Sequence, residues 1–202
     1  MQKAAFFDVD GTLTTTHVWR GLMEYFRQHK FRRLTHYAFL TYHAPKRYFL
    51  RKGWITELSF RTSWALDLAW YVRGLSIVQT EPIWGWVTTN YLKTYWRTDV
   101  LERLKSHQQN GDLVVLVSAG PLPLIQRIAF EYGVEHVVGT RLETKNNLYT
   151  GHSIKPACIG EYKVELSKVY LAKNNLEIDF ENSAAYADSI TDLPMLDMVG
   201  KP

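Results

Sequence analysis

The sequence is poor in cysteine and has no long apolar run. Cys158 is the single cysteine among 202 residues, so an internal disulfide cannot form and a reducing compartment is expected. The first apolar stretch, residues 4–7, ends at Asp8 and is too short for a signal peptide. No stretch approaches the roughly 20 apolar residues that cross a bilayer. These absences favour a cytoplasmic globular protein.

Acidic residues are scarce in one part of the chain. Between Thr14 and Thr98 there are 13 Lys or Arg residues and only 4 Asp or Glu residues, whereas the remainder holds 11 basic and 16 acidic residues. All 7 tryptophans lie in the same segment. Because composition changes at both ends, we predict an inserted domain at residues 15–98 within a domain formed by 1–14 and 99–202.

Helical spacing dominates the insertion, and no strand is expected in it. Val18, Leu22 and Phe26 fit one face of a first helix. Pro45 is expected to break the stretch 31–52, and Pro82 to precede a last helix at 83–95. The insertion is therefore predicted to be all-helical.

From residue 99 onward, helices and short apolar strands alternate. Strands are predicted at 113–117, 134–142 and 184–187, and helices at 100–109, 121–132 and 160–174. Asn146-Asn147 is a hairpin turn signal. This alternation is typical of an α/β fold with a mostly parallel, doubly wound sheet.

Two carboxylates follow the first apolar strand. Asp8 and Asp10 are two residues apart and are followed by Gly11, which can turn the chain. Neighbouring carboxylates repel each other unless a cation or a shared proton offsets the repulsion. Mg²⁺ prefers such oxygen ligands. Acidic pairs also cap helices and close turns, so this pair alone leaves both interpretations open.

Polar loops follow two further predicted strands, at residues 118–120 and 188–192. Because the ends of parallel strands lie on one edge of a sheet, these loops are expected to meet the loop of Asp8 and Asp10. The convergence strengthens the prediction of a site.

The loops resemble the motifs of a known superfamily. Asp8-Val9-Asp10-Gly11-Thr12 resembles the first motif, D-x-D-G-T, of the haloacid dehalogenase phosphatases and phosphotransferases. Ser118 resembles the second, Lys163 in Gly160-Glu161-Tyr162-Lys163 the third, and residues 188–196 the fourth, D-S-x-x-D-L-P-M-L. The fourth motif and the helical insertion are similar to the phosphoserine phosphatase-like group, subfamily IB. The resemblance covers residues 3–14 and 99–199.

The resemblance implies a Rossmann-like core, a helical cap and a two-step reaction. Asp8 would attack phosphorus to form an aspartyl phosphate, and Asp10 would act as acid and then as base. Mg²⁺ would be held by Asp8, Asp188 and the backbone carbonyl of Asp10. Asp192 would orient the metal shell or Lys163.

Phosphate binding is assigned by the same resemblance. The hydroxyl of Ser118, the backbone N–H of Ala119 and the ammonium of Lys163 would hold the phosphate. Lys155 and Lys168 are competing lysines in this part of the sequence, but the helix and strand that follow Lys163 have the expected spacing.

The chain departs from the phosphoserine-specific pattern. Thr15, Thr16 and His17 stand where those enzymes place an acid for the substrate amine, and the first acid comes at Glu24. Phosphoserine is therefore not the expected substrate. Ala187 replaces a common glycine, and the sequence ends at residue 202, where relatives usually continue with another strand.

The basic and aromatic insertion favours an amphiphilic or lipid-like phosphate. Residues 31–34 and 46–52 combine Arg or Lys with aromatic rings and could make peripheral contact with an anionic membrane. Alternatively, the aromatics form the core of the cap and the basic residues a solvated face. Nucleic acid binding has no motif in its support.

The predicted function is a Mg²⁺-dependent phosphomonoesterase that acts on a phosphorylated small molecule. A phosphotransferase using the same intermediate and a non-catalytic module that binds a membrane or a protein are the alternatives. The intact set of acidic residues and lysine argues against the second of these.

Overall fold

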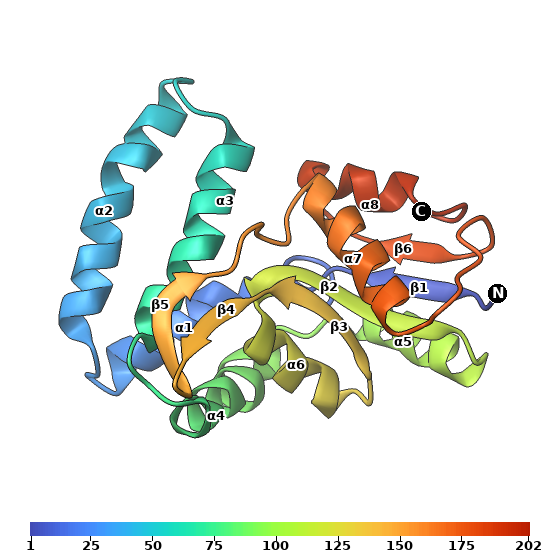
Figure 1. Ribbon diagram of the computed structural model, residues 1–202, viewed down its shortest axis with the longest axis horizontal. Helices are drawn as coiled ribbons and strands as arrows, with labels where there is room; N and C mark the ends of the chain where they lie inside the picture. The colour runs from blue at the N-terminus through green and yellow to red at the C-terminus, as the bar shows by residue number, and fades with distance from the viewer.

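A parallel sheet unites the two ends of the chain (Figure 1). The computed structural model describes residues 1–202, and its main sheet has four strands in the order β3-β2-β1-β6. The strands are β1 (Ala4–Phe7), β2 (Leu113–Pro121), β3 (His136–Thr140) and β6 (Ala184–Tyr186). Phe7 lies opposite Leu116 on one side and Tyr186 on the other. The predicted parallel α/β sheet is confirmed.

Helices cover both faces of this sheet because β1 and β2 are buried on both sides. Ala5 and Phe7 face α5 (Thr98–Gln109) and α6 (Leu122–Glu131), whereas Ala4 and Phe6 face α7 (Glu161–Lys173) and α8 (Leu193–Asp197). Side chains alternate between the two faces of a strand, so an unbroken apolar run serves both layers. The fold is doubly wound, as predicted.

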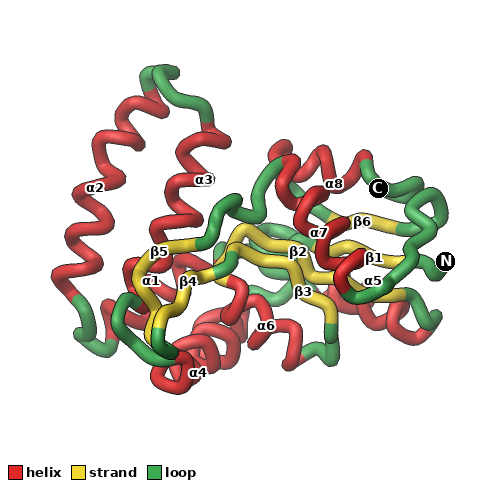
Figure 2. Tube along the Cα trace, viewed as in Figure 1, coloured by secondary structure: helices red, strands yellow, loops and turns green.

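The segment between β1 and α5 contains helices, their connecting turns and no strand. It contains α1 (Val18–Gln28), α2 (Arg33–Arg51), α3 (Glu57–Asp67) and α4 (Ile77–Trp86), with short helical turns at Leu68–Val72, Val87–Tyr91 and Leu92–Thr94. Helices α2 and α3 form a long hairpin that projects away from the sheet (Figure 2).

Two proline predictions are wrong. Pro45 lies inside α2, and Pro82 lies inside α4, which begins at Ile77 rather than at residue 83. A capping box explains the earlier start, because Ser76 Oγ accepts from the Gln79 N–H and Gln79 Oε1 accepts from the Ser76 N–H. In α4 the cap offsets the hydrogen bond that Pro82 removes, and in α2 the packing of Phe39 and His43 offsets the one that Pro45 removes.

A small antiparallel hairpin joins the sheet domain to the helical segment. Strands β4 (Leu142–Lys145) and β5 (Leu148–Ser153) are connected by Asn146 and Asn147, both with positive φ, as the turn signal predicted. The Tyr149 N–H donates to the Leu75 carbonyl at 2.9 Å. The predicted strand 134–142 is therefore two elements, β3 and the start of β4.

Strand β2 is longer than predicted and ends at Pro121, because Pro121 pairs with Thr140 after a register shift. Cys158 is buried in the core, and burial raises the pKa of its thiol to about 12. None of the helices combines the length and the apolar character that crossing a membrane requires.

Candidate active site

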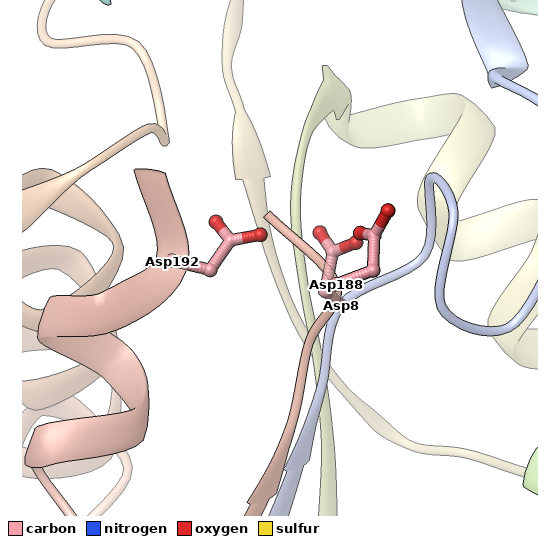
Figure 3. Close-up of side chains that lie close together, drawn as sticks. All are labelled: Asp8, Asp188 and Asp192. Atoms are coloured by element: carbon pink, nitrogen blue, oxygen red, sulfur yellow. The ribbon is translucent and has the colours of Figure 1, made fainter. Parts of the chain in front are cut away.

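Three aspartates converge at the carboxyl edge of the sheet (Figure 3). Asp8 follows β1, Asp188 follows β6, and Asp192 ends a helical turn, Ile190–Asp192. Their carboxylate oxygens lie within 4.8 Å of one another. The hydrogen bond from the Asp8 N–H to the Tyr186 carbonyl, 2.9 Å long, continues the β1–β6 pairing and brings the two loops together.

Lys163 is the lysine that reaches this cluster. Its Nζ lies 2.5 Å from Asp8 Oδ1 and 2.7 Å from Asp192 Oδ1, and its side chain is buried. The competing lysines, Lys155 and Lys168, are exposed. Burial lowers the pKa of Lys163, but the two carboxylates outweigh burial and raise that pKa, so the group remains an ammonium.

The site contains more negative than positive charge. Burial is the largest cause that raises the pKa of Asp8 to about 7, against the opposing effect of Lys163. Burial also raises the pKa of Asp10 to about 6, although the Val18 N–H donates to its Oδ1 at 2.6 Å. One ammonium thus faces four aspartates, counting Asp188 and Asp192.

The Gly11-Thr12 turn packs directly on Asp188. Gly11 has φ +94°, and a Cβ at this position would lie 2.1 Å from Asp188 Oδ2. Thr12 Oγ1 donates to Asp188 Oδ1 at 3.3 Å. The glycine is therefore required by both the backbone conformation and the space.

The predicted Mg²⁺ ion fits this donor set. The clustered ligand atoms are all carboxylate oxygens, and the uncompensated negative charge is what a divalent cation would offset. Asp192 belongs to the carboxylate cluster but also pairs with Lys163, and Asp10 lies outside the cluster, where its side chain is bound to the start of α1.

The carboxyl end of β2, where a polar loop was predicted at residues 118–120, supplies backbone groups to the site. The hydroxyl of Ser118 is fully buried and accepts from the Gly120 N–H at 3.0 Å. The Ala119 carbonyl accepts from Thr140 Oγ1 at 2.7 Å, which ties this end of β2 to β3. Ala119 and Gly120 line the cavity beside the aspartates, whereas Ser118 does not line it.

A cavity of about 420 Å³ connects this edge with the helical segment. Its size is that of a small-molecule site. On the sheet side it is lined by Asp8, Asp10, Lys163 and Asp192. The helical side contributes basic and apolar side chains, namely Trp19, Arg20, Arg47, Leu50, Phe60, Arg61 and Trp64.

Arg61 connects the two walls of the cavity. It donates to Ser189 Oγ at 3.1 Å and pairs with Glu57 at 2.7 Å. Glu57 also lines the cavity, so an acid is present there although none occurs soon after the first motif. The Arg61 guanidinium neutralises the charge of the Glu57 carboxylate.

Sequence reasoning missed the lining residues of the helical segment. The only signal was the basic, aromatic composition, which marks the segment as a whole. Helical spacing within α1, α2 and α3 cannot show which face of each helix turns toward the sheet domain.

Comparisons with known proteins agree with these observations. The family model for haloacid dehalogenase-like hydrolases matches residues 5–197. A phosphoserine phosphatase of Mycobacterium tuberculosis is 27% identical over 204 residues, which cover 99% of this chain and 63% of that protein. The chain spans 34% to 63% of the length of the curated relatives that it matches first.

Solved structures share the fold. A protein of unknown function from Bordetella pertussis has a TM-score of 0.79 and 23% identity, covering 100% of this chain and 89% of that one. A phosphoserine phosphatase solved as a phospho-aspartyl intermediate analogue has a TM-score of 0.61 and 18% identity, covering 98% and 84%. The chain belongs to the haloacid dehalogenase-like hydrolase family, in its phosphoserine phosphatase-like group.

Proposed function

We propose that the protein is a Mg²⁺-dependent phosphomonoesterase that works through an aspartyl phosphate on Asp8. The observation that carries the proposal is the contact of Asp8 with buried Lys163 beside two further aspartates, all at one edge of the cavity. The phosphatases among its relatives support the same chemistry.

In the first step, an Asp8 oxygen attacks phosphorus and the bond from phosphorus to the ester oxygen breaks. Lys163 holds Asp8 by one hydrogen bond and leaves its other carboxylate oxygen for the attack. Asp10 gives its proton to the leaving oxygen, and the Val18 N–H keeps that carboxyl group in place.

In the second step, water attacks the phosphorus of the aspartyl phosphate and Asp10 takes a proton from it. Asp8 and inorganic phosphate are released. The hydroxyl of Ser118, the backbone N–H of Ala119 and the Lys163 ammonium would hold the phosphate oxygens. The Gly120 N–H donates to the Ser118 hydroxyl and fixes its position.

Mg²⁺ would be held by Asp8, Asp188 and the backbone carbonyl of Asp10, with Asp192 behind them. When bound, it neutralises negative charge on the phosphate and on the carboxylates. Asp192 restrains Lys163 through their ion pair, and Thr12 restrains Asp188.

The proposed domain division is a core of residues 1–14 and 99–202 and a helical cap of residues 15–98. Paired connections support these limits, because the Thr15 N–H donates to the Tyr95 carbonyl at 2.8 Å and the Arg97 N–H to the Leu13 carbonyl at 2.9 Å. The two segments that connect the core with the cap thus run side by side.

The proposed substrate is an amphiphilic, lipid-like phosphate, processed in the cytoplasm at or near a membrane surface. The cap side of the cavity supports this class, because Trp19, Phe60 and Trp64 give an apolar wall beside basic side chains. A small zwitterion such as phosphoserine would leave this wall without a partner.

The test is phosphate release from a panel of phosphomonoesters, small polar and long-chain, with Mg²⁺ or EDTA. We expect Mg²⁺-dependent turnover that Asp8→Asn abolishes and that the exposed-site control Asp197→Asn retains. Preference for the long-chain esters would support the substrate class.

The rival activities have their own outcomes in this experiment. Release that increases when an alcohol acceptor is added, with formation of a new ester, would favour a phosphotransferase. A folded protein that releases no phosphate from any ester would overturn the proposal in favour of a binding module.

A further inference from the structure

The α2–α3 hairpin ends in exposed aromatic and basic side chains. We call these residues the hairpin tip: Tyr48, Phe49, Arg51, Lys52 and Trp54. Tyr48, Phe49 and Trp54 are 53%, 37% and 69% exposed, respectively. Phe49 and Trp54 stack at 5.4 Å, and the Lys52 ammonium lies 5.8 Å from the centre of the Tyr48 ring. The tip stands clear of the sheet domain (Figure 1).

The base of the hairpin is packed in the ordinary way. Phe39 and His43 are buried, and the Phe39 ring lies 4.8 Å from Trp64 and 5.3 Å from Tyr71. The cap therefore builds its own core from the aromatics at the base. The rings at the tip take no part in that core, so packing within the cap does not account for them.

Charge indicates what the tip can contact. Residues 25–56 contain eight Lys or Arg residues and no Asp or Glu. A second copy that docked hairpin to hairpin would bring an equally basic surface and would be repelled. An anionic surface would be attracted by the same charges.

We propose that the hairpin tip docks the protein on an anionic membrane surface. Trp and Tyr rings are favoured at the boundary between headgroups and acyl chains, where one part of the ring is apolar and another polar. Arg51 and Lys52 would pair with anionic headgroups, and their stems would lie along the apolar boundary.

The shape of the tip favours a membrane over nucleic acid. Proteins that bind single-stranded nucleic acid place their aromatic rings along a basic groove that follows the strand. The tip is the free end of a helical hairpin (Figure 1), and Arg47 and Leu50 of the same part of α2 line the cavity. The exposed rings at such an end can insert into a lipid surface.

Docking in this way would bring the cavity close to the lipid. Arg47 and Leu50 line the cavity, and Tyr48, Phe49 and Arg51 next to them are exposed. A phosphate carried by an amphiphile in the membrane would thus have a short path to the aspartates. The inference itself stands apart from the phosphatase proposal, because membrane binding is measured without turnover.

The experiment is cosedimentation of the full chain with two kinds of vesicle. One is pure phosphatidylcholine, and the other contains equal parts of phosphatidylcholine and phosphatidylserine. We expect binding to the anionic vesicles that weakens with added salt, and little binding to the neutral ones. Arg51→Gln with Lys52→Gln, and separately Trp54→Ala, should each weaken binding by about tenfold or more.

Matched controls lie outside the hairpin. Arg103 and Lys105 are exposed on α5, so Arg103→Gln with Lys105→Gln makes the same charge change elsewhere. Phe130 is 74% exposed on α6, so Phe130→Ala removes an exposed ring elsewhere. These variants should bind anionic vesicles as the unmodified protein does. Circular dichroism and the thermal midpoint of unfolding establish that each variant is folded.

Several results would overturn the proposal. Equal binding to both vesicle types would contradict selection of an anionic surface. No binding at low salt would show that the protein does not bind the membrane. Equal losses in tip and control variants would show that the tip is not the binding surface. Tighter binding to a single-stranded oligonucleotide than to anionic vesicles, lost in the tip variants, would show that the basic hairpin serves nucleic acid.

Discussion

Gly11 packs against Asp188 so closely that no side chain fits between them. Gly11→Ala should displace the Asp188 carboxylate and weaken Mg²⁺ binding. The Mg²⁺ concentration that gives half-maximal turnover should therefore rise by about 10- to 100-fold. The positive φ adds a separate strain on the order of 1 kcal/mol to the free energy of folding. A Mg²⁺ titration of activity, with unfolding measured in parallel, separates the two effects.

Gly111 provides the control for backbone strain. It has φ +76°, and a Cβ there would meet nothing within 4 Å. Gly111→Ala should lose a similar amount of stability and keep the Mg²⁺ dependence unchanged. If Gly11→Ala kept the Mg²⁺ dependence of the unmodified protein, Asp188 would not be a metal ligand.

Lys163 neutralises carboxylates that have no other cation in the chain. Lys163→Met leaves Asp8 and Asp192 buried without their partner, and breaking a buried pair in this way costs about 3 kcal/mol. Urea unfolding in EDTA should reveal this loss. Lys168→Met, on the exposed face of the same helix, should change the free energy of unfolding by less than about 0.5 kcal/mol.

Proposed catalytic residues such as Asp8 and Lys163 could be predicted from the sequence because they belong to short motifs. Asp8 and Lys163 each lie where a strand or helix end fixes the local backbone, and the pattern of neighbours identifies them. Arg61 has no such pattern, because its role depends on how α3 is oriented toward the loop of Ser189. That orientation is set by packing over long sequence distances.

At the scale of elements, the proposed cap is anchored along its base and free at its tip. The Gly74 N–H donates to the Tyr149 carbonyl at 2.6 Å, and Ser153 Oγ donates to the Leu66 carbonyl at 2.8 Å. These two bonds hold the base on the β4–β5 hairpin, and the paired connections at Thr15 and Arg97 hold it next to the end of β1. Opening of the cavity is therefore expected to involve bending of α2 and α3.

Hydrogen exchange tests this distribution of stability. Backbone amides near the tip, such as that of Gly53, should exchange faster than those of Thr15 and Tyr149 by a factor on the order of 100. Mass spectrometry of peptides from each region measures the difference. Equal exchange at Thr15 and at the tip would indicate that the whole cap opens on its connections.

Elements were predicted well where the local pattern decides and poorly where it competes with packing. The strand that begins at Leu113 was recognisable from its apolar run, but its end at Pro121 depends on pairing with Thr140. Pro45 and Pro82 act as breakers in a short peptide. In this chain, burial of Phe39 on one helix and of Trp84 on the other stabilises helices that run through them.

At the scale of the whole molecule, charge is divided between the two parts. The helical segment is basic and the remainder acidic, and the cavity lies where they meet. This division could be read from composition alone. The strand order could not, because parallel pairing of β1 with both β2 and β6 joins residues more than a hundred positions apart.

Mg²⁺ should stabilise the entire fold through the aspartate cluster. The folded chain gathers Asp8, Asp188 and Asp192 within 4.8 Å, whereas the unfolded chain separates them, so only the folded state offers the ion a site. An ion at about 100 times its dissociation constant adds about 2.7 kcal/mol to the free energy of unfolding. For a chain of this size the thermal midpoint should rise by about 5–10 °C.

Asp188→Asn separates this effect from general salt effects. The substitution removes one of the repelling carboxylates, so the midpoint in EDTA should stay the same or rise slightly, while the increase caused by Mg²⁺ should disappear. Asp197→Asn, on the exposed face of α8, removes an equal charge and should retain the full increase. Scanning calorimetry at constant ionic strength makes the comparison, and a Mg²⁺ increase that persists in Asp188→Asn would place the ion elsewhere.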